Sequence, residues 1–324
     1  MNKIRILSVF LVVIMLVLVG CKQQTATGPV YNPFIGGKEG LRMEWVEGMP
    51  PDTVLDEGKM RFGTGIKLTN VGEEYLGVGS GYVELIGINP KDFNKESQSD
   101  LRKFFPIPLR EAKKNLEGTV IAGGQGVIEF SDLKYIHDLK GNTDVKIRAN
   151  LCYDYRTKTS TKICAKKELV ELGKSKICDI AGTKDPKNSG GPVQITSVRE
   201  SPVGEGKIQV LFVVEHVGGA NNIIYKRGTE CDDSLANPNR NVIYARVTSE
   251  IYGKKAECMG FEDPDQDGQG GYFVMYGSQK REITCTYDIN EIGSAVFEPL
   301  FTVDLFYRYH QYIEKQIIVR DVTG

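Results

Sequence analysis

The sequence has few of the residues from which metal and catalytic centres are built. It contains 3 histidines (His137, His216 and His310), which lie far apart, and 1 tryptophan, Trp45. No histidine belongs to an H-E-x-x-H arrangement, and the 7 cysteines include no C-x-x-C pair. Zinc sites use such closely spaced ligands. We therefore expect a structural role for each histidine and no metal–thiolate site.

The motifs of nucleophilic catalysis and of phosphate binding are also missing. Ser80 lies in the stretch GVGSG, but Val78 and Tyr82 occupy the places where a nucleophile elbow has glycine. Neither this stretch nor GGQG at 123–126 matches a dinucleotide-binding loop or a P-loop. These absences favour a protein that is not an enzyme. An enzyme with an unrecognised site between two modules is kept as an alternative.

Neither sign of charge dominates the chain. The 41 basic and 42 acidic residues are scattered and give a formal net charge of -1. Nucleic-acid-binding domains usually carry a clustered basic patch. No basic block with interleaved aromatic residues occurs here, so we expect no nucleic-acid partner.

A single apolar run opens the chain, and it is short for a membrane span. The basic stretch Met1–Arg5 precedes fourteen residues, 6–19, of which one is polar. A membrane-spanning helix needs about 20 apolar residues, whereas this run ends just before Cys21 and then turns polar. A basic start followed by a short apolar run is typical of a secretory signal. We predict a signal peptide over residues 1–20.

The residues Leu18-Val19-Gly20-Cys21 resemble the lipobox of bacterial and archaeal lipoproteins. In that family the leader is cut before the cysteine, and the thiol then carries a lipid. The resemblance implies lipidation of Cys21 and a chain that is lipid-anchored at the extracytoplasmic face of the cell membrane. The small, polar residues that follow predict a flexible tether at 21–36. The alternative is an uncleaved N-terminal anchor.

The rest of the chain predicts an all-β fold built from a repeat. Glycine is abundant, with 36 residues, and short runs rich in Val, Ile, Thr, Tyr and Phe lie between turn residues. The Val-Gly turn at 71–72 recurs at 217–218, and the pattern Leu-x-Tyr-x-Tyr at 151–155 recurs at 305–309. Residues two apart share one face of a strand. Each pattern therefore predicts an apolar strand face that carries two tyrosines.

We expect two tandem Ig-like β-sandwich domains. The first covers residues 37–180 and carries a loop insertion at 91–118. A linker at 181–192, rich in Gly, Pro, Asn, Lys and Asp, precedes the second domain at 193–324. The lipobox, the stretch GLRMEWVEGMPP, the NVG turn and the LCYDY hairpin together resemble uncharacterised archaeal surface lipoproteins with tandem Ig-like domains of the CARDB type. The Cys-Trp-Cys order of antibody domains is absent, because the tryptophan precedes all but the first cysteine.

Once Cys21 is lipidated, six cysteines remain. An even number of cysteines in an exported chain predicts disulfides, although the spacing alone leaves many connectivities open. A turn predicted near Lys158 favours the first bridge, a Gly-rich turn favours the second, and elimination gives the third. The expected bridges are Cys152–Cys164, Cys258–Cys285 and Cys178–Cys231.

The stretch DPDQDGQGG at 263–271 is the best candidate for a specific ligand. Asp263, Asp265 and Asp267 precede a glycine, as in the first half of a D-x-D-x-D-G calcium loop. The twelfth position, however, holds Val274 instead of a bidentate glutamate. A weak calcium site and a solvated hairpin tip are both open at this point, and we expect no other cofactor.

We therefore expect a non-catalytic, lipid-anchored cell-surface protein with a structural or binding role. One alternative is an adhesin that binds a glycan or a protein through loops 91–118 and 263–271. Another is an accessory subunit of an envelope assembly. The expected partners are the membrane, through the lipid on Cys21, and a surface protein or glycan.

Overall fold

The computed structural model describes residues 32–115, 117–166, 177–276, 280–293 and 295–322. The described residues from Pro33 to Val322 form one compact unit. The predicted signal peptide, the lipidation site Cys21 and most of the tether lie outside the described residues. In the part of the chain that is described, no helix has both the length and the apolar character needed to cross a membrane.

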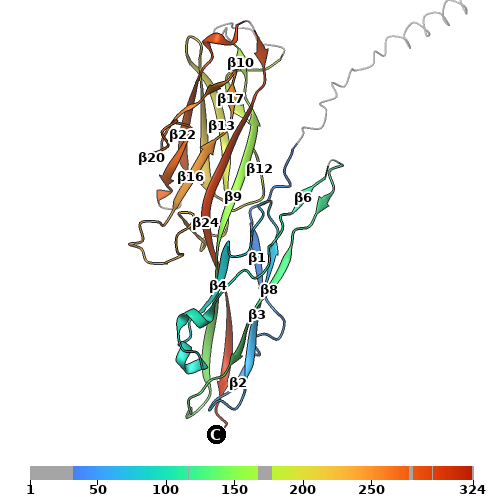
Figure 1. The fold of residues 1–324 in the computed structure, drawn as a ribbon, viewed down its shortest axis with the longest axis vertical. Helices are drawn as coiled ribbons and strands as arrows, with labels where there is room; N and C mark the ends of the chain where they lie inside the picture. Colours follow the sequence, from blue (N-terminus) through green and yellow to red (C-terminus); the bar gives the residue numbers. More distant parts are fainter. Residues whose placement is uncertain (1–31, 116, 167–176, 277–279, 294, 323–324) are drawn as a thin grey trace, which may run out of the picture. The chain divides into compact units, whose positions relative to one another are not determined.

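The described residues are all-β, as predicted, with short 3-10 turns between some of the strands (Figure 1). The strands are β1 (Leu41–Trp45), β2 (Thr53–Leu55), β3 (Phe62–Asn70), β4 (Gly81–Ile86), β5 (Arg102–Phe104), β6 (Lys113–Lys114), β7 (Val120–Ile121), β8 (Gln125–Leu133), β9 (Thr143–Lys162), β10 (Ala165–Lys166), β11 (Gly182–Lys184), β12 (Lys187–Asn188), β13 (Val193–Gly204), β14 (Lys207–His216), β15 (Ile223–Tyr225), β16 (Val242–Val247), β17 (Glu250–Ile251), β18 (Lys254–Lys255), β19 (Glu257–Met259), β20 (Asp263–Pro264), β21 (Gly270–Val274), β22 (Arg281–Asp288), β23 (Val296–Phe297) and β24 (Leu300–Arg320). The 3-10 helices are η1 (Pro90–Phe93), η2 (Gln98–Leu101) and η4 (Asn290–Ile292).

Two long strands, β9 and β24, form the centre of the fold (Figure 1). They pair antiparallel from Thr143 opposite Val319 to Lys162 opposite Leu300, without a register shift. Successive side chains of a strand point to opposite faces, and the odd-numbered residues of both strands are mostly buried. We call their side the inner face of the β9–β24 pair, and the other side its outer face.

The β9–β24 pair lies within a ten-stranded sheet, and two smaller sheets pack on its inner face. One of these has the order β1-β3-β8, and the other has the order β11-β13-β14-β22-β19. The backbone N–H of Leu41 on β1 donates to Tyr153 Oη on β9 at 3.2 Å. In the second sheet, Phe212 on β14 packs against Phe301 on β24 with ring centroids 5.8 Å apart. The result is sandwich-like, and both smaller sheets use the β9–β24 pair as their facing layer.

The backbone shows the repeat at the Val-Gly turns. The carbonyl of Gly40 accepts hydrogen bonds from the N–H groups of residues 71–72, and the carbonyl of Pro192 accepts them from residues 217–218. The accepting residue precedes β1 in the first case and β13 in the second. These strands pair antiparallel with β3 and β14, the strands that lead into the two turns. Two parts of the chain therefore repeat the same local arrangement.

Four tyrosines of the repeated Leu-x-Tyr-x-Tyr pattern meet at the middle of the inner face. Tyr155 lies opposite Tyr307, and Tyr153 lies opposite Tyr309. All four are buried, and neighbouring ring centroids are 5.8 to 6.3 Å apart. A buried phenol needs a hydrogen-bond partner, and each hydroxyl has one. These partners are Leu41 N for Tyr153, Gly190 O for Tyr155, Thr157 Oγ1 for Tyr307, and His216 Nε2 with Asn222 Nδ2 for Tyr309.

Residues 181–192, predicted as a linker, contain the two short strands β11 and β12. β11 pairs with β13, whereas β12 pairs with β9. Asn188 Oδ1 accepts hydrogen bonds from Thr159 Oγ1 at 2.6 Å and from the backbone N–H of Ile195 at 3.0 Å. The segment is therefore tied to the ten-stranded sheet and to the five-stranded sheet at once.

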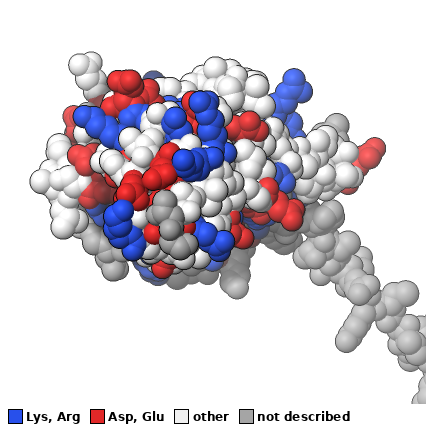
Figure 2. Space-filling model, turned by 90° about the horizontal axis from the view of Figure 1, so that it is seen from below, with Lys and Arg blue, Asp and Glu red and all other residues white. Residues whose placement is uncertain are grey.

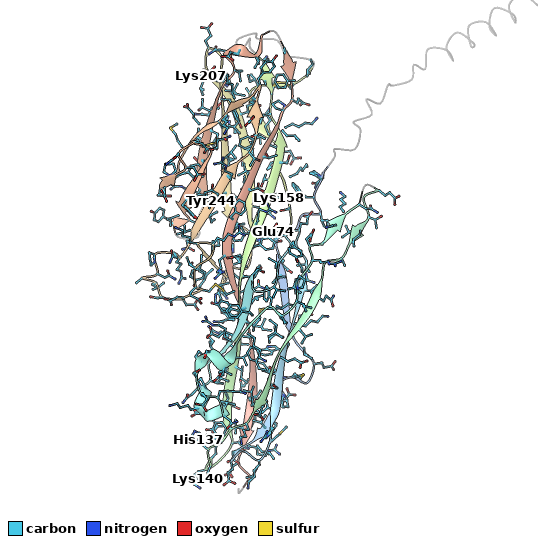
Figure 3. The ribbon with its side chains drawn as sticks, viewed as in Figure 1. Glu74, His137, Lys140, Lys158, Lys207 and Tyr244 are labelled. Atoms are coloured by element: carbon cyan, nitrogen blue, oxygen red, sulfur yellow. A yellow bond between two sulfur atoms is a disulfide. The ribbon has the colours of Figure 1, made fainter. Side chains whose placement is uncertain are left out.

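Hydrogen-bonded charged side chains tie other segments to the two long strands and the sheets around them at two places. Glu200 on β13 is buried, pairs with Lys184 Nζ at 2.8 Å and accepts the N–H of Cys164 at 2.9 Å. Burial raises the pKa of Glu200 to about 7, although the hydrogen bonds from Lys184 and Cys164 act in the opposite direction. Halfway along β9, the guanidinium of Arg156 donates to Glu74 at 3.0 and 3.1 Å. Figure 3 labels Glu74 next to Lys158 of β9.

The surface carries both signs of charge in close alternation. In the view of Figure 2, Lys and Arg side chains alternate with Asp and Glu over the visible face. Exposed ion pairs such as Arg61 with Asp132, at 2.8 Å, account for part of this pattern. Such pairs contribute about 0–1 kcal/mol each to stability. On this face, charge therefore affects solubility more than it stabilises the fold.

The two Val-Gly turns give a test of the repeat. A methyl group added at Gly72 would collide with the hydroxyl of Tyr155, and one added at Gly218 would collide with the hydroxyl of Tyr309. We expect Gly72→Ala and Gly218→Ala each to lower the free energy of unfolding by about 1–3 kcal/mol, the usual cost of overpacking. Urea unfolding measures the effect.

Gly77→Ala is the matched control, because its added methyl group would lie 3.7 Å from the nearest atom, on the Tyr75 ring. We expect this variant to unfold close to wild type. Equal stability of all three variants would contradict the packing described for the two turns.

Candidate functional site

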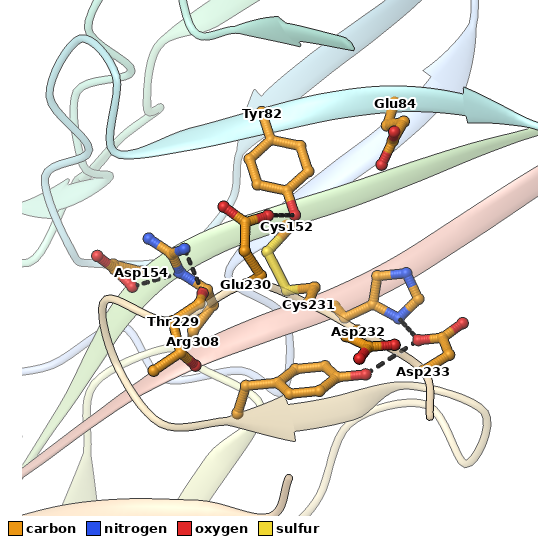
Figure 4. Close-up of a disulfide and its surroundings, with 12 residues drawn as sticks. Tyr82, Glu84, Cys152, Asp154, Thr229, Glu230, Cys231, Asp232, Asp233 and Arg308 are labelled. Atoms are coloured by element: carbon orange, nitrogen blue, oxygen red, sulfur yellow. Dashed lines mark hydrogen bonds and ion pairs between the residues drawn. A yellow bond between two sulfur atoms is a disulfide. The ribbon is translucent and has the colours of Figure 1, made fainter. Parts of the chain in front are cut away.

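The outer face of the β9–β24 pair has one buried spot. Of the even-numbered residues of the two strands, only Cys152 and His310 are buried, and they are register partners. Residues 226–241, which join β15 to β16, lie over them. A disulfide from Cys152 to Cys231 fixes this segment to the sheet (Figure 4). We call residues 226–241 the stapled loop.

The stapled loop is closed at its base. The N–H of Lys226 donates to the carbonyl of Asn239 at 2.8 Å, and the N–H of Asn241 donates to the carbonyl of Ile224 at 2.7 Å. A surface segment whose ends meet in this way is an Ω-loop, a type that frequently carries function. The loop is therefore held at its two ends and, through the disulfide, in its middle.

An ion pair between β9 and β24 holds residues 228–229, near the start of the stapled loop. Arg308 Nε donates to Asp154 Oδ1 at 2.8 Å, and Arg308 Nη1 donates to the carbonyl of Thr229. The same Asp154 oxygen accepts the N–H of Gly228 at 3.2 Å. Figure 4 shows Asp154, Thr229 and Arg308 grouped beside the disulfide. The outer face thus binds the loop backbone through charge-assisted hydrogen bonds, which are stronger than neutral ones.

A second cluster joins the stapled loop to the first part of the chain. Arg102 of β5 pairs with Glu84 at 3.1 Å and with Glu230 of the loop at 3.0 Å. The hydroxyl of Tyr82 on β4 also donates to Glu230, at 3.0 Å. Burial, together with this hydrogen bond, raises the pKa of Tyr82 to about 12, so the phenol keeps its proton. The loop therefore contacts strands from both parts of the chain.

His310 lies beneath the part of the stapled loop that follows Cys231. It is 1 % exposed, and neither of its ring nitrogens has a hydrogen-bond partner among the described residues. Its Nδ1 lies 3.6 Å from Asp233 Oδ1, an oxygen that also accepts the hydroxyl of Tyr225 at 2.9 Å. Burial lowers the pKa of His310, while Asp233 acts in the opposite direction. The imidazole is therefore a neutral packing element under the loop.

A pocket of ≈ 680 Å³ opens beside the stapled loop. This volume lies within the range of small-molecule sites, about 300–1,000 Å³. Its walls include His216 at the end of β14, Asn222 before β15, Arg240 of the loop and Tyr312 of β24. The Nε2 of His216 is hydrogen-bonded to the hydroxyl of Tyr309, and burial lowers the pKa of His216. The pocket therefore offers neutral polar groups and one guanidinium.

The rim of the pocket displays an apolar side chain. Leu235, in the middle of the stapled loop, is 89 % exposed and contributes to the pocket lining. Its neighbours from Asp232 to Ala236 are also exposed. An exposed leucine alone is ordinary, but this one is held in place by a disulfide and two ion-pair clusters. A rigidly presented side chain loses little conformational entropy when it binds a partner.

The structure corrects two of the three predicted disulfides. The predicted Cys258–Cys285 bridge is present, between β19 and β22. The predictions of Cys152–Cys164 and Cys178–Cys231 are wrong, because the chain does not turn near Lys158. Residues 143–162 form one strand, so Cys152 and Cys164 lie about 12 residues apart along an extended chain, at roughly 3.3 Å per residue. The observed bridges are Cys152–Cys231 and Cys164–Cys178.

The acidic stretch 263–271 differs from the calcium loop that its sequence suggests. Arg246 on β16 binds Asp265 at 2.9 Å and Asp267 through a second ion pair, while Asp263 lies in β20. An arginine therefore takes up the two carboxylates that a cation would need. Among the described residues, no group of three or more His, Cys, Asp or Glu side chains is placed to hold a metal ion.

The predicted insertion at 91–118 contains η2, β5, β6 and most of η1, and most of its described residues are exposed. Phe105 and Leu109 are buried, whereas Phe104 and Ile107 are exposed. Neither this segment nor 263–271 lines the pocket beside the stapled loop. The insertion meets the site only through Arg102, which pairs with Glu230.

The stapled loop itself was not predicted as a site. Its sequence, KRGTECDDSLANPNRN, is polar and rich in turn-forming residues, with a single cysteine. A signal was nevertheless present, because the alternation of β9 places Cys152 on the face opposite the tyrosines. A cysteine on that face points to a covering segment that the strand pattern alone does not show.

No protein-family model and no curated protein matches the chain. Among solved structures, a mutant of CfaE, the CFA/I adhesin of enterotoxigenic E. coli, is similar to it at 11% sequence identity. The match covers 90% of this chain and 88% of that chain, with a TM-score of 0.11. A TM-score of this size does not indicate a shared fold.

We expect the Cys152–Cys231 disulfide to hold the stapled loop rather than only to stabilise the fold. In Cys152→Ser with Cys231→Ser, trypsin should cleave after Arg227 much faster than in wild type, because the loop can leave the sheet. The bridge closes a separation of 79 residues, so its loss should also lower the free energy of unfolding by about 4 kcal/mol.

The matched control is Cys258→Ser with Cys285→Ser, which opens a bridge at a separation of 27 residues between β19 and β22. This variant should lose stability without faster cleavage at Arg227. Equal cleavage rates in the two double variants would show that the disulfide does not hold the loop.

Proposed function

We propose that the chain is a lipid-anchored, extracytoplasmic binding protein that is not an enzyme. The observation that carries this proposal is the stapled loop, which presents Leu235, 89 % exposed, at the rim of a ≈ 680 Å³ pocket. Binding residues are often placed on loops that a rigid scaffold positions. Here the scaffold is the β9–β24 pair, and the disulfide fixes the loop to it.

We also propose that the two repeated parts are Ig-like sandwiches. The matching contacts of the Val-Gly turns and the paired tyrosines support this assignment. Three disulfides support an extracytoplasmic location, because such bridges persist in oxidising compartments. The lipobox resemblance at Cys21 supports the anchor.

The environments of the three histidines support a role without catalysis. His137 pairs with Asp92 at 2.9 Å in an exposed position. His216 bonds to a buried tyrosine, and His310 is buried without a hydrogen-bond partner among the described residues. General acid–base catalysis needs a histidine within reach of a substrate proton. Of the three, only His216 reaches the pocket, where Tyr309 already holds its Nε2.

The anchor is tested by replacing the lipidation residue in the full-length chain. When membranes are solubilised and the detergent is phase-separated, wild-type protein should enter the detergent phase. Its mature N-terminus should be Cys21 with the added mass of a lipid. Cys21→Ala should lose both properties. A mature wild-type chain that keeps residues 1–20 and has an unmodified Cys21 would contradict the anchor.

The binding role is tested by changing the loop tip and measuring attachment to intact cells and to purified surface glycans and proteins. Leu235→Asp should weaken binding at least tenfold, because a carboxylate replaces the displayed apolar side chain. Leu300→Asp is the control, since Leu300 is 57 % exposed at the start of β24 and lies outside the pocket lining. If Leu235→Asp and Leu300→Asp bound as wild type does, the stapled loop would not be the binding element.

A further inference from the structure

Arg240 is the one residue of the pocket lining that carries a full charge at neutral pH. Its Nη1 donates to the backbone carbonyl of Asp233 at 2.9 Å. No ion pair joins Arg240 to a carboxylate in the described part of the chain, whereas Arg102 and Arg308 nearby are both paired with acids. An arginine fork can bind a carboxylate through two parallel hydrogen bonds. The pocket thus has a binding group for an anion that the protein does not itself fill.

The surrounding acids do not cancel this charge inside the pocket. The carboxylate of Asp233 points to Tyr225 and His310, and neither Asp232 nor Asp233 lines the pocket. A negatively charged ligand would therefore meet a guanidinium without an opposing carboxylate in the lining. The carboxylates of Asp232 and Asp233, outside the pocket lining, would repel additional negative charges of a ligand. A ligand with one negative charge is therefore favoured over a highly charged one.

The rest of the lining fits a ligand rich in hydroxyl groups. Asn221, Asn222 and Asn241 line the pocket, and the Nδ2 of Asn222 already donates one hydrogen bond to Tyr309. An amide both donates and accepts hydrogen bonds, which matches the two roles of a hydroxyl. Ile223 and Tyr312 add apolar surface of the kind that covers the C–H face of a sugar ring. Mixed lining of this sort, with a few directed polar groups, is usual for small-molecule sites.

We propose that the pocket binds a carboxylate-bearing sugar, with Arg240 holding the carboxylate and the asparagine amides holding the hydroxyls. This assignment rests on the proposed binding function and names the ligand class of the same pocket. The volume of ≈ 680 Å³ leaves room for a sugar residue with part of a neighbour. The sugar could arrive free or as part of a glycan chain, and both present the same chemistry.

The test is calorimetric titration of the full-length protein in detergent with four probes. These are glucuronic acid, its methyl ester, glucose and a disaccharide in which glucuronic acid is linked to glucose. We expect glucuronic acid to bind at least tenfold more tightly than its ester and glucose, since only the acid offers a carboxylate to Arg240. Tighter binding of the disaccharide than of glucuronic acid would identify a glycan chain as the source, and equal or weaker binding would identify the free sugar.

Two variants separate the guanidinium of Arg240 from general charge. Arg240→Met should reduce the affinity for glucuronic acid to that of glucose, whereas Arg227→Met, on the same loop but outside the pocket lining, should bind as wild type does. The comparison of acid with ester in wild-type protein does not depend on how the variants fold. Equal affinity for acid, ester and glucose would overturn the assignment of the carboxylate and leave the binding function standing.

If none of the four probes bound, the sugar assignment would be overturned. The proposed function has its own test in the Leu235→Asp variant on cells and surface proteins. If the protein then bound a protein partner in a way that depended on Leu235, that partner would replace the sugar as the ligand. If neither sugar binding nor Leu235-dependent binding were found, the binding function itself would be overturned.

Discussion

The fold depends on one uninterrupted antiparallel pairing, that of β9 with β24. Every inner-face residue of β9 from Ile147 to Thr161 is buried, and this face covers both smaller sheets in turn. Of the four central tyrosines, Tyr153 is hydrogen-bonded to Leu41 of β1, and Tyr309 is hydrogen-bonded to His216 of β14. The outer face is left free for function, and its one buried spot, at Cys152 and His310, is where the stapled loop lies.

Much of this design could be predicted from the sequence, but the continuity of β9 could not. The short runs rich in Val, Ile, Thr, Tyr and Phe predicted the all-β fold, and each Leu-x-Tyr-x-Tyr pattern predicted a strand face with two tyrosines, but not the pairing of the two faces. We predicted a turn near Lys158, yet the strand continues there, and Thr157, Thr159 and Thr161 are buried on its inner face. Their hydroxyls bond to Tyr307, Asn188 and the carbonyl of Asp185. A buried threonine is tolerated when its hydroxyl has a partner, and such partners come from distant parts of the chain.

The candidate site was hidden for the same reason. Cys152 pairs with Cys231 because β9 continues through Lys158 instead of turning there, so spacing and elimination led to the wrong partners for Cys152, Cys164, Cys178 and Cys231. The acidic stretch near Asp265 had a local motif but was already neutralised by Arg246. Arg240, in contrast, has no motif around it. Its importance follows only from the absence of a carboxylate partner in the described chain and from its place in the pocket.

We expect the two sandwich-like parts to unfold as one cooperative unit, because both pack on the continuous β9–β24 pair that supports the stapled loop. Native-state hydrogen exchange of the backbone amides of β9 tests this claim most directly. If the pairing is continuous, amides on both sides of Tyr155 should exchange only through global unfolding and share the same free energy of opening. If amides before and after Tyr155 opened with clearly different free energies, the two parts would unfold separately, and the shared scaffold beneath the stapled loop would be contradicted.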